Sequence, residues 1–237
     1  MNDSDKWYAE AGTSYLNHSS KIKSDSVYYL QRRADEESAI SNFNYAIHFG
    51  AIINHLQLQS GIGIFKPGEK TNYNNIGTCL SLKSTGYYLP DSTFVYQYDS
   101  TYHIAKNDSL IKQNGTHTNS YLTIPLEVYY HFPMNKIDVN VGGGMSGAFP
   151  LKWNSIYINQ QVTQLENLSD LKMLNRVVLN LNLNLEIVIP VYKNFSFMLD
   201  AEYRKNLNSV FKKSYSVNQK YQSVGAGVSV RYNFNKK

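Results

Sequence analysis

Residues 179–190, LNLNLNLEIVIP, alternate between apolar and polar side chains, a pattern typical of a β-strand with one apolar face. The same period of two dominates several other segments, whereas stretches with a helical period are short and lie between them. We therefore expect about eight strands, an even number that suits an antiparallel up-and-down barrel. The predicted strands cover residues 7–16, 44–53, 56–65, 121–132, 137–149, 179–192, 195–204 and 221–234.

The connections between these segments alternate in length along the chain. The short connections are Asn54–His55, Pro133–Lys136 and Lys193–Asn194, and the long ones cover roughly residues 17–42, 67–119, 150–175 and 205–220. Alternate connections of an up-and-down barrel lie at the same end, so we expect the short turns at one end and the long loops at the other. Outer-membrane barrels have short periplasmic turns and longer extracellular loops. The sequence therefore predicts one barrel domain over residues 1–237, with both termini at the periplasmic end.

Alternation alone does not say which face of the barrel is apolar. A soluble, lipocalin-like barrel places its apolar face inside around a ligand, whereas a membrane barrel places it outside against lipid. The polar face here is rich in Gly and Ser, which suit the crowded interior of a small barrel. Aromatic residues gather at the strand ends of the apolar face, as they do at membrane interfaces. Together with the sorting of the loops, these observations favour a membrane barrel, with the leucines of residues 179–185 facing lipid.

The polar face of such a barrel forms a narrow lumen that contains ionisable side chains. The charged residues predicted to face this lumen are Glu10, Glu127, Asp138, Glu186, Asp200, Glu202, Arg204 and Arg231. Buried carboxylates need partners, because an isolated charge away from water is very costly. Acids outnumber bases in this set, so we expect Arg231 and Arg204 to be shared between carboxylates, with Tyr and Asn completing the hydrogen bonds. A wide diffusion pore is not expected from eight strands.

Composition agrees with a barrel rather than a helical membrane protein. Mean hydropathy is −0.41, and no apolar stretch approaches the roughly 18 residues of a transmembrane helix. The net charge is only +5, and its Lys and Arg fall mostly in turn-like segments. Solvated loops account for them, and contact with anionic glycolipid is the alternative; a nucleic-acid-binding module is not recognisable. The single cysteine, Cys79, excludes an internal disulfide.

The start of the chain lacks the basic and apolar regions of an export signal. Because the strand pattern favours an envelope protein, we expect a mature form whose signal peptide has been removed.

The connection over residues 67–119 is far longer than ordinary loops, and loops of this length are usually functional or disordered. Residues 93–104 alternate as a strand and are rich in aromatics, so we expect a hairpin that extends the barrel above the membrane. Its candidate interaction surface consists of Tyr88, Phe94, Tyr96, Tyr98 and Tyr102, because exposed tyrosines suit protein recognition. The alternative is a loop that packs on itself and shields the barrel mouth.

Candidate chemistry is sparse. The six histidines are scattered without metal-ligand spacing, and neither a cofactor motif nor a phosphate loop is present. His103, Asp108 and Ser109 lie close together in the sequence, but no nucleophile-elbow context supports a catalytic set. We therefore expect a protein that is not an enzyme and that binds no cofactor or metal.

Three segments resemble one known family. YLTIPLEVYYHFP (121–133), VNVGGGMSGAF (139–149) and VGAGVSVRYNF (224–234) are similar to the small outer-membrane β-barrels that include PorT-like proteins of Gram-negative envelopes. The resemblance implies insertion by the outer-membrane assembly machinery, for which Phe234 would be the C-terminal aromatic residue. It also implies a role in secretion, motility or envelope assembly, and it supplies no active site.

The sequence thus predicts a non-enzymatic outer-membrane barrel that acts as a structural or partner-docking component. Its expected partners are outer-membrane lipid and lipopolysaccharide, the assembly machinery, and proteins at the loops or the periplasmic rim. A narrow channel or small-ligand-binding barrel is the main alternative, and a soluble lipocalin-like barrel is the third interpretation.

Overall fold

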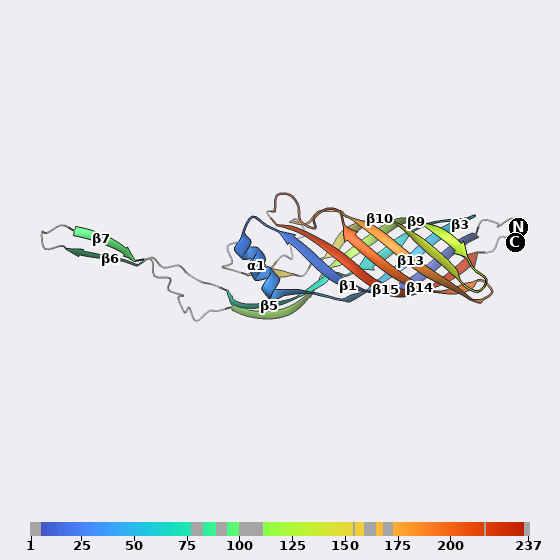
Figure 1. The fold of residues 1–237 in the computed structure, drawn as a ribbon, viewed down its shortest axis with the longest axis horizontal. Helices are drawn as coiled ribbons and strands as arrows, with labels where there is room; N and C mark the ends of the chain where they lie inside the picture. The colour runs from blue at the N-terminus through green and yellow to red at the C-terminus, as the bar shows by residue number, and fades with distance from the viewer. Residues whose placement is uncertain are drawn as a thin grey trace.

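The computed structural model describes residues 6–76, 83–88, 94–99, 111–153, 155–158, 165–167, 173–215 and 217–234. Eight antiparallel strands form a closed barrel in the order β1-β15-β14-β13-β10-β9-β4-β3, so the predicted fold class is confirmed (Figure 1). The barrel strands are β1 (Lys6–Lys23), β3 (Asn42–Ile53), β4 (Leu56–Phe65), β9 (Ser120–Pro133), β10 (Asp138–Lys152), β13 (Val178–Tyr192), β14 (Phe195–Asn206) and β15 (Asn218–Phe234). Closure comes from β1, which pairs with β3 on one side and β15 on the other.

The tight turns gather at one end of the barrel, as predicted. Two of them contain the non-glycine residues with positive φ, Asn54 (φ 56°) and Lys193 (φ 42°), a conformation that short hairpin turns require. Figure 1 shows both termini at this same end and α1 at the opposite end. We call the end with the turns the turn end and the other the loop end.

The outer face of the barrel is apolar over a continuous band. Leu126 is 68% exposed, and alternate residues along each barrel strand are exposed apolar side chains. On β1 the band runs from Trp7 to Tyr15, about 26 Å along the strand and about 20 Å along the axis at a usual tilt. Aromatic pairs border it, with ring centres 5.0 Å apart for Phe195 and Tyr232 at the turn end, and 5.0 Å for Tyr15 and Phe43 nearer the loop end. The apolar face thus points outward, contrary to the lipocalin-like interpretation.

Glycines on the inner face serve two roles, close approach between strands and room for side chains in the lumen. A Cβ at Gly144 would lie 2.0 Å from the carbonyl oxygen of Leu126 on the neighbouring strand. At Gly227 a Cβ would instead lie 2.5 Å from the Asp200 carboxylate. The prediction that small residues make room in the lumen therefore holds for Gly227, whereas Gly144 lets β9 and β10 curl tightly.

The barrel strands continue past the apolar band at the loop end, which corrects the predicted boundaries. β1 runs to Lys23, and the expected loop 17–42 contains α1 (Val27–Glu36) and β2 (Glu37–Ile40). The connection 67–119 contains β5 (Gly68–Ile76), β6 (Lys83–Tyr88), β7 (Phe94–Asp99) and β8 (Ile111–Thr118), and a further short pair is β11 (Ile156–Ile158) with β12 (Leu165–Asn167). β2, β5 and β8 form a three-stranded sheet, and β6 pairs with β7. Within the described ranges, the only α-helix is α1, and no helix there is long and apolar enough to cross a membrane.

We call α1 together with β2, β5 and β8 the cap. One apolar core joins the cap to the barrel, because Tyr29 and Tyr73 of the cap belong to the same buried cluster as Leu16 and Phe65 of the barrel. The loop end is therefore a packed structure and not a set of independent loops.

Candidate functional site

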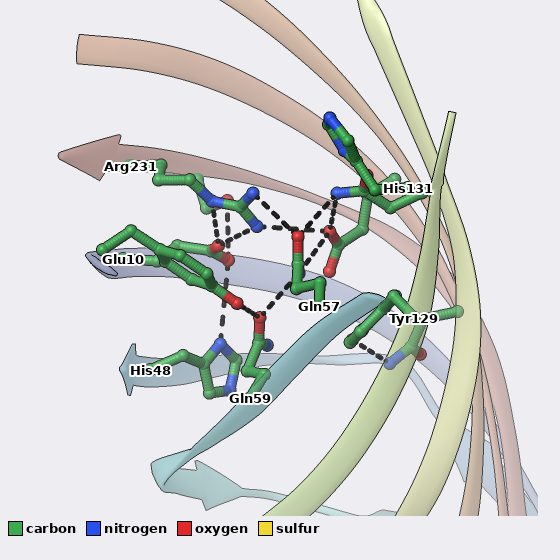
Figure 2. A network of polar contacts seen from close by, with 12 residues as sticks. Glu10, His48, Gln57, Gln59, Tyr129, His131 and Arg231 are labelled. Atoms are coloured by element: carbon green, nitrogen blue, oxygen red, sulfur yellow. Dashed lines mark hydrogen bonds and ion pairs between the residues drawn. The ribbon is translucent and has the colours of Figure 1, made fainter. Parts of the chain in front are cut away.

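A buried ion-pair cluster crosses the lumen near the turn end (Figure 2). Arg231 donates from Nη2 to Glu10 Oε2 at 2.9 Å and to Glu186 Oε2 at 3.3 Å. Its side chain is only 2% exposed, and those of the two glutamates are 7% and 4% exposed. One guanidinium is therefore shared between two carboxylates, in the way proposed for Arg231 from the sequence.

The strand register explains why these three residues meet. Glu10 on β1 lies directly opposite Arg231 on β15 and opposite His48 on β3. Glu186 on β13 lies opposite Asn140 on β10. Residues opposite each other share a face of the sheet, so all of these side chains face the lumen. The register leads from Arg231 through Ser196 to Pro190, four residues from Glu186, so the tilt of the strands is what brings Glu186 to the level of Arg231.

Two amides fill the space between the charges. Gln57 Oε1 accepts hydrogen bonds from Arg231 Nη1 and from Asn140 Nδ2, both at 3.1 Å. Asn140 Nδ2 also donates to Glu186 Oε2 at 2.9 Å. Both amide residues are fully buried, with 0% exposure. The amides therefore bridge from the ion pair to the opposite wall of the lumen.

Tyr8 and His48 complete the cluster on the β1–β3 side. The Tyr8 hydroxyl donates to Gln59 Oε1 at 2.7 Å, and its ring centre lies 4.0 Å from Arg231 Cζ. His48 Nδ1 is 3.7 Å from Glu10 Oε1. Figure 2 shows these side chains converging from several strands. The resulting layer of charged, amide and aromatic groups fills the lumen at the turn end, and we call it the polar plug.

A cavity of about 80 Å³ lies beside the polar plug. Its lining includes Glu127, Asp200, Glu202 and Arg204. Glu127 accepts hydrogen bonds from the Tyr129 hydroxyl and from lumen asparagines, and it has no ion pair among the residues that the structure describes. The cavity wall therefore carries more negative than positive charge.

Arg204 behaves differently from Arg231. Its Nη2 is 2.6 Å from Glu202 Oε1, and its Cζ lies 4.7 Å from the ring centre of Phe65. Glu202 is its sole ion-pair partner in the described part of the chain. The expected sharing of Arg204 between several carboxylates is therefore not seen.

Aromatic and aliphatic side chains close the lumen toward the loop end. Phe65 and Tyr121 lie on the inner face of β4 and β9, and the ring centres of Tyr121 and Trp153 are 5.9 Å apart in an edge-to-face arrangement. Trp153 in turn contacts Phe211, with ring centres 5.9 Å apart. All four of these side chains are at most 3% exposed. We call this layer the apolar plug.

A second buried charge cluster lies in the cap. Arg33 of α1 donates from Nε to Glu37 at 2.6 Å, and its Nη2 is 3.6 Å from Glu69 Oε2 on β5. Burial opposes the charge on Arg33, but the Glu37 and Glu69 carboxylates outweigh this effect and hold the pKa of Arg33 well above its usual value. Gln219 of β15 donates to Glu69 at 2.6 Å, which ties the cap cluster to the barrel wall.

The predicted lumen residues fall into two groups in the structure. Glu10, Glu127, Glu186, Asp200, Glu202, Arg204 and Arg231 line the lumen in or beside the polar plug. Asp138 lies at the turn end, where it is 27% exposed, accepts from the backbone N–H of Met134 at 3.3 Å and stands 3.9 Å from His131 Nε2. It is thus a rim residue and not a member of the central cluster.

The predicted loop surface is placed in part. Tyr88 lies opposite Phe94 in the β6–β7 register, and Tyr96 and Tyr98 follow along β7, so these four positions lie on one face of the hairpin. Tyr102 lies outside the described residues, as do His103, Asp108 and Ser109. Phe234 is the last residue of β15, lies opposite Trp7, and is 46% exposed on the outer face.

Several residues of the two buried clusters were not predicted from the sequence. The alternation LQLQ places Gln57 and Gln59 on the polar face, but the predicted lumen set is based on charge and does not include them. The sequence also indicates the ion pair of the cap cluster, since Arg33 and Glu37 have the i, i+4 spacing of a helical ion pair. No local sequence pattern indicates the role of Glu69, because its partners lie on α1 and β15.

Among the described residues, no group of three or more His, Cys, Asp or Glu side chains is placed to hold a metal ion. The polar plug and the cap cluster are instead arranged as internally paired networks.

The comparisons with known proteins agree with the barrel architecture. No family model matches the chain, and no curated protein matches it. Among solved structures it is similar to the outer membrane protein OprG from Pseudomonas aeruginosa, with 11% identity, coverage of 98% of this chain and 96% of that chain, and a TM-score of 0.50. Neisserial surface protein A has 12% identity, coverage of 96% and 97%, and a TM-score of 0.43. At such low identity the likeness concerns the fold alone, which is that of the small eight-stranded outer-membrane β-barrels.

Proposed function

We propose that this chain is an integral protein of the bacterial outer membrane in which a non-conducting barrel anchors an extracellular, partner-docking cap. The observation that carries this proposal is the filling of the lumen at two levels. The polar plug occupies the turn end, the apolar plug occupies the loop end, and a space of about 80 Å³ lies between them.

The outer face supports the membrane location. An apolar band about 20 Å high, bordered by aromatic residues, matches the lipid-facing surface of outer-membrane barrels, which is about 25 Å tall. With the turn end in the periplasm, the cap and the β6–β7 hairpin stand outside the cell. Insertion would then depend on the outer-membrane assembly machinery, with Phe234 as the C-terminal aromatic residue.

The cap supports the docking role. A recess of about 480 Å³ opens beneath α1, within the range of ligand pockets, and its wall includes Ile22, Leu30, Arg33 and Glu69. The β6–β7 hairpin adds a row of aromatic positions, a residue class that suits protein recognition. The resemblance to PorT-like proteins is the reason for proposing a partner in secretion, motility or envelope assembly. The proposed role needs no enzymatic activity and no cofactor.

The second candidate function is a narrow cation channel. It is favoured by the surplus of carboxylates around the central cavity, where Glu127 and Asp200 lie beside the Glu202–Arg204 pair. Passage would require both plugs to move.

Planar-bilayer recordings test the non-conducting barrel. The purified protein should insert and give no steady openings, while an unrelated porin in the same bilayer conducts. Steady cation-selective openings would instead establish the channel.

A hairpin deletion tests the docking role. Ile76 of β5 pairs with Ile111 of β8, so an Asn-Gly turn can replace residues 77–110 and keep both strands. Cross-linking on intact cells should recover a partner with the full chain and lose it with this deletion, provided that both variants reach the surface. Equal recovery from the two variants would rule out the hairpin as the docking element.

A further inference from the structure

Lysines gather on the outer face of three adjacent strands, just beyond the apolar band at the loop end. Lys21 of β1 lies directly opposite Lys220 of β15. Lys23 follows Lys21 on the same face, and Lys205 of β14 lies opposite Gln222, the next outward residue from Lys220. We call Lys21, Lys23, Lys205 and Lys220 the lysine face.

Among the residues that the structure describes, no acidic side chain forms an ion pair with this face. The other outward positions on these strand ends are uncharged (Asn17, Ser19, Leu207, Asn218 and Gln222), and the nearest acid along β1 is Asp25, beyond the end of the strand. Within the described part of the chain, none of the four lysines forms an ion pair, and Lys220 Nζ donates to the Leu207 carbonyl at 2.5 Å. Like charges directly opposite each other on a sheet are unfavourable. A bound anion would therefore reduce the repulsion between Lys21 and Lys220.

Below the lysine face, past the uncharged polar residues Asn17, Ser19 and Gln222, the outer surface becomes apolar. Val224 lies two outward positions below Lys220 on β15, is 60% exposed, and is paired with Tyr203 of β14. Four residues separate Val224 from Lys220, or about 13 Å along the strand. A molecule that spans this boundary would meet lysines with one end and an aliphatic and aromatic wall with the other.

We propose that the lysine face binds the phosphate groups of a phosphorylated lipid in the outer leaflet, with the acyl chains of that lipid on the wall around Val224 and Tyr203. Lysine ammonium groups bind phosphate as point charges. Four ammonium groups at the edge of a lipid-facing surface would hold an anionic headgroup at one level along the barrel axis. This inference rests on the orientation given under Proposed function, with the loop end outside, but it does not depend on a partner protein or on conductance.

Lipid binding by the purified, detergent-solubilised protein tests the proposal. The probe is lipid A with two phosphates, titrated against the folded barrel and detected by native mass spectrometry; the same lipid without phosphates is the first control. The double substitution K21Q/K220Q should weaken binding of the phosphorylated lipid by about thirtyfold, as expected from the loss of two interfacial charges. The dephosphorylated lipid should bind weakly to both forms.

Two matched variants make the result specific. K6Q/K136Q removes the same charge from exposed positions at the turn end and should leave binding unchanged. K21R/K220R keeps the charge and should bind nearly as well as the natural chain. Equal loss in K21Q/K220Q and K6Q/K136Q, or equal affinity for the two lipids, would overturn the proposal. Equally tight binding of a soluble glucosamine phosphate would overturn the lipid assignment.

The test of lipid binding can fail while the proposed function holds. K21Q/K220Q should still reach the surface, give no steady conductance and keep the hairpin-dependent partner. A failure of lipid binding with those properties intact would remove only the lysine face.

Discussion

Arg231 is the residue on which the interior charge balance depends. It is 2% exposed and forms ion pairs with both Glu10 and Glu186, while Gln57 joins it to the opposite wall. Truncation of one partner in a buried pair is strongly destabilising, because the remaining charge stays buried without compensation. Here the loss of one guanidinium would leave two such carboxylates.

Arg231→Ala should therefore lower the free energy of unfolding by about 3–5 kcal/mol. Urea titration in lipid vesicles, followed by tryptophan fluorescence, measures this change. The double variant R231A/E186Q should recover part of the loss, since one of the two stranded carboxylates is removed. Unchanged stability of Arg231→Ala would contradict the role given to the polar plug.

Arg204→Ala provides the matched comparison within the same lumen. Arg204 pairs with one carboxylate, and both side chains of that pair are 13% exposed and border the cavity. Its loss should cost clearly less than that of Arg231, because water in the cavity can solvate Glu202.

At the scale of elements, β10 shows how tightly the strands are wound. Gly144 brings β10 against the backbone of β9, and a Cβ there would lie 2.0 Å from the Leu126 oxygen. Gly147, on the same strand, has its nearest neighbour at 3.5 Å, an ordinary contact. The two positions differ in packing but not in strand or residue type.

Gly144→Ala should destabilise the barrel by about 1–3 kcal/mol, the usual range for overpacking. Gly147→Ala should be close to neutral. The same urea titration compares them, and equal effects at the two positions would show that close approach between β9 and β10 is not what requires Gly144.

The elements also show what the sequence could predict. Alternation over residues 179–192 located β13 almost to the residue, because the lipid-facing and lumen-facing sides differ in polarity there. Beyond the apolar band that contrast ends, and the continuation of β1 to Lys23 was therefore missed. Charged lumen positions followed from the same alternation, whereas the link from Glu69 to Gln219 depends on how the cap packs and has no pattern in the chain.

At the scale of the molecule, the sorting of short turns and packed cap gives the barrel a direction in the membrane. Cys79, the only cysteine, follows β5 of the cap in the chain and precedes β6. Lys136 lies between β9 and β10, at the turn end.

A membrane-impermeant maleimide should therefore label Cys79 on intact cells. In a C79S background, a Lys136→Cys variant should be labelled only after the envelope is permeabilised. Mass-tag shifts on gels report both reactions. Labelling of Lys136→Cys, but not of Cys79, on intact cells would reverse the orientation and would also place the lysine face in the wrong leaflet.

The pairing of β1 with β15 has a consequence for biogenesis. Trp7 pairs with Phe234 and Lys23 pairs with Asn218, so β1 and β15 are paired along their full length. These contacts have the largest sequence separation in the molecule, and such pairings are slow to form because a long loop must close first. Until the last strand is made, β1 has an unpaired edge that could join another chain. Pairing with β15 closes the barrel and removes this open edge.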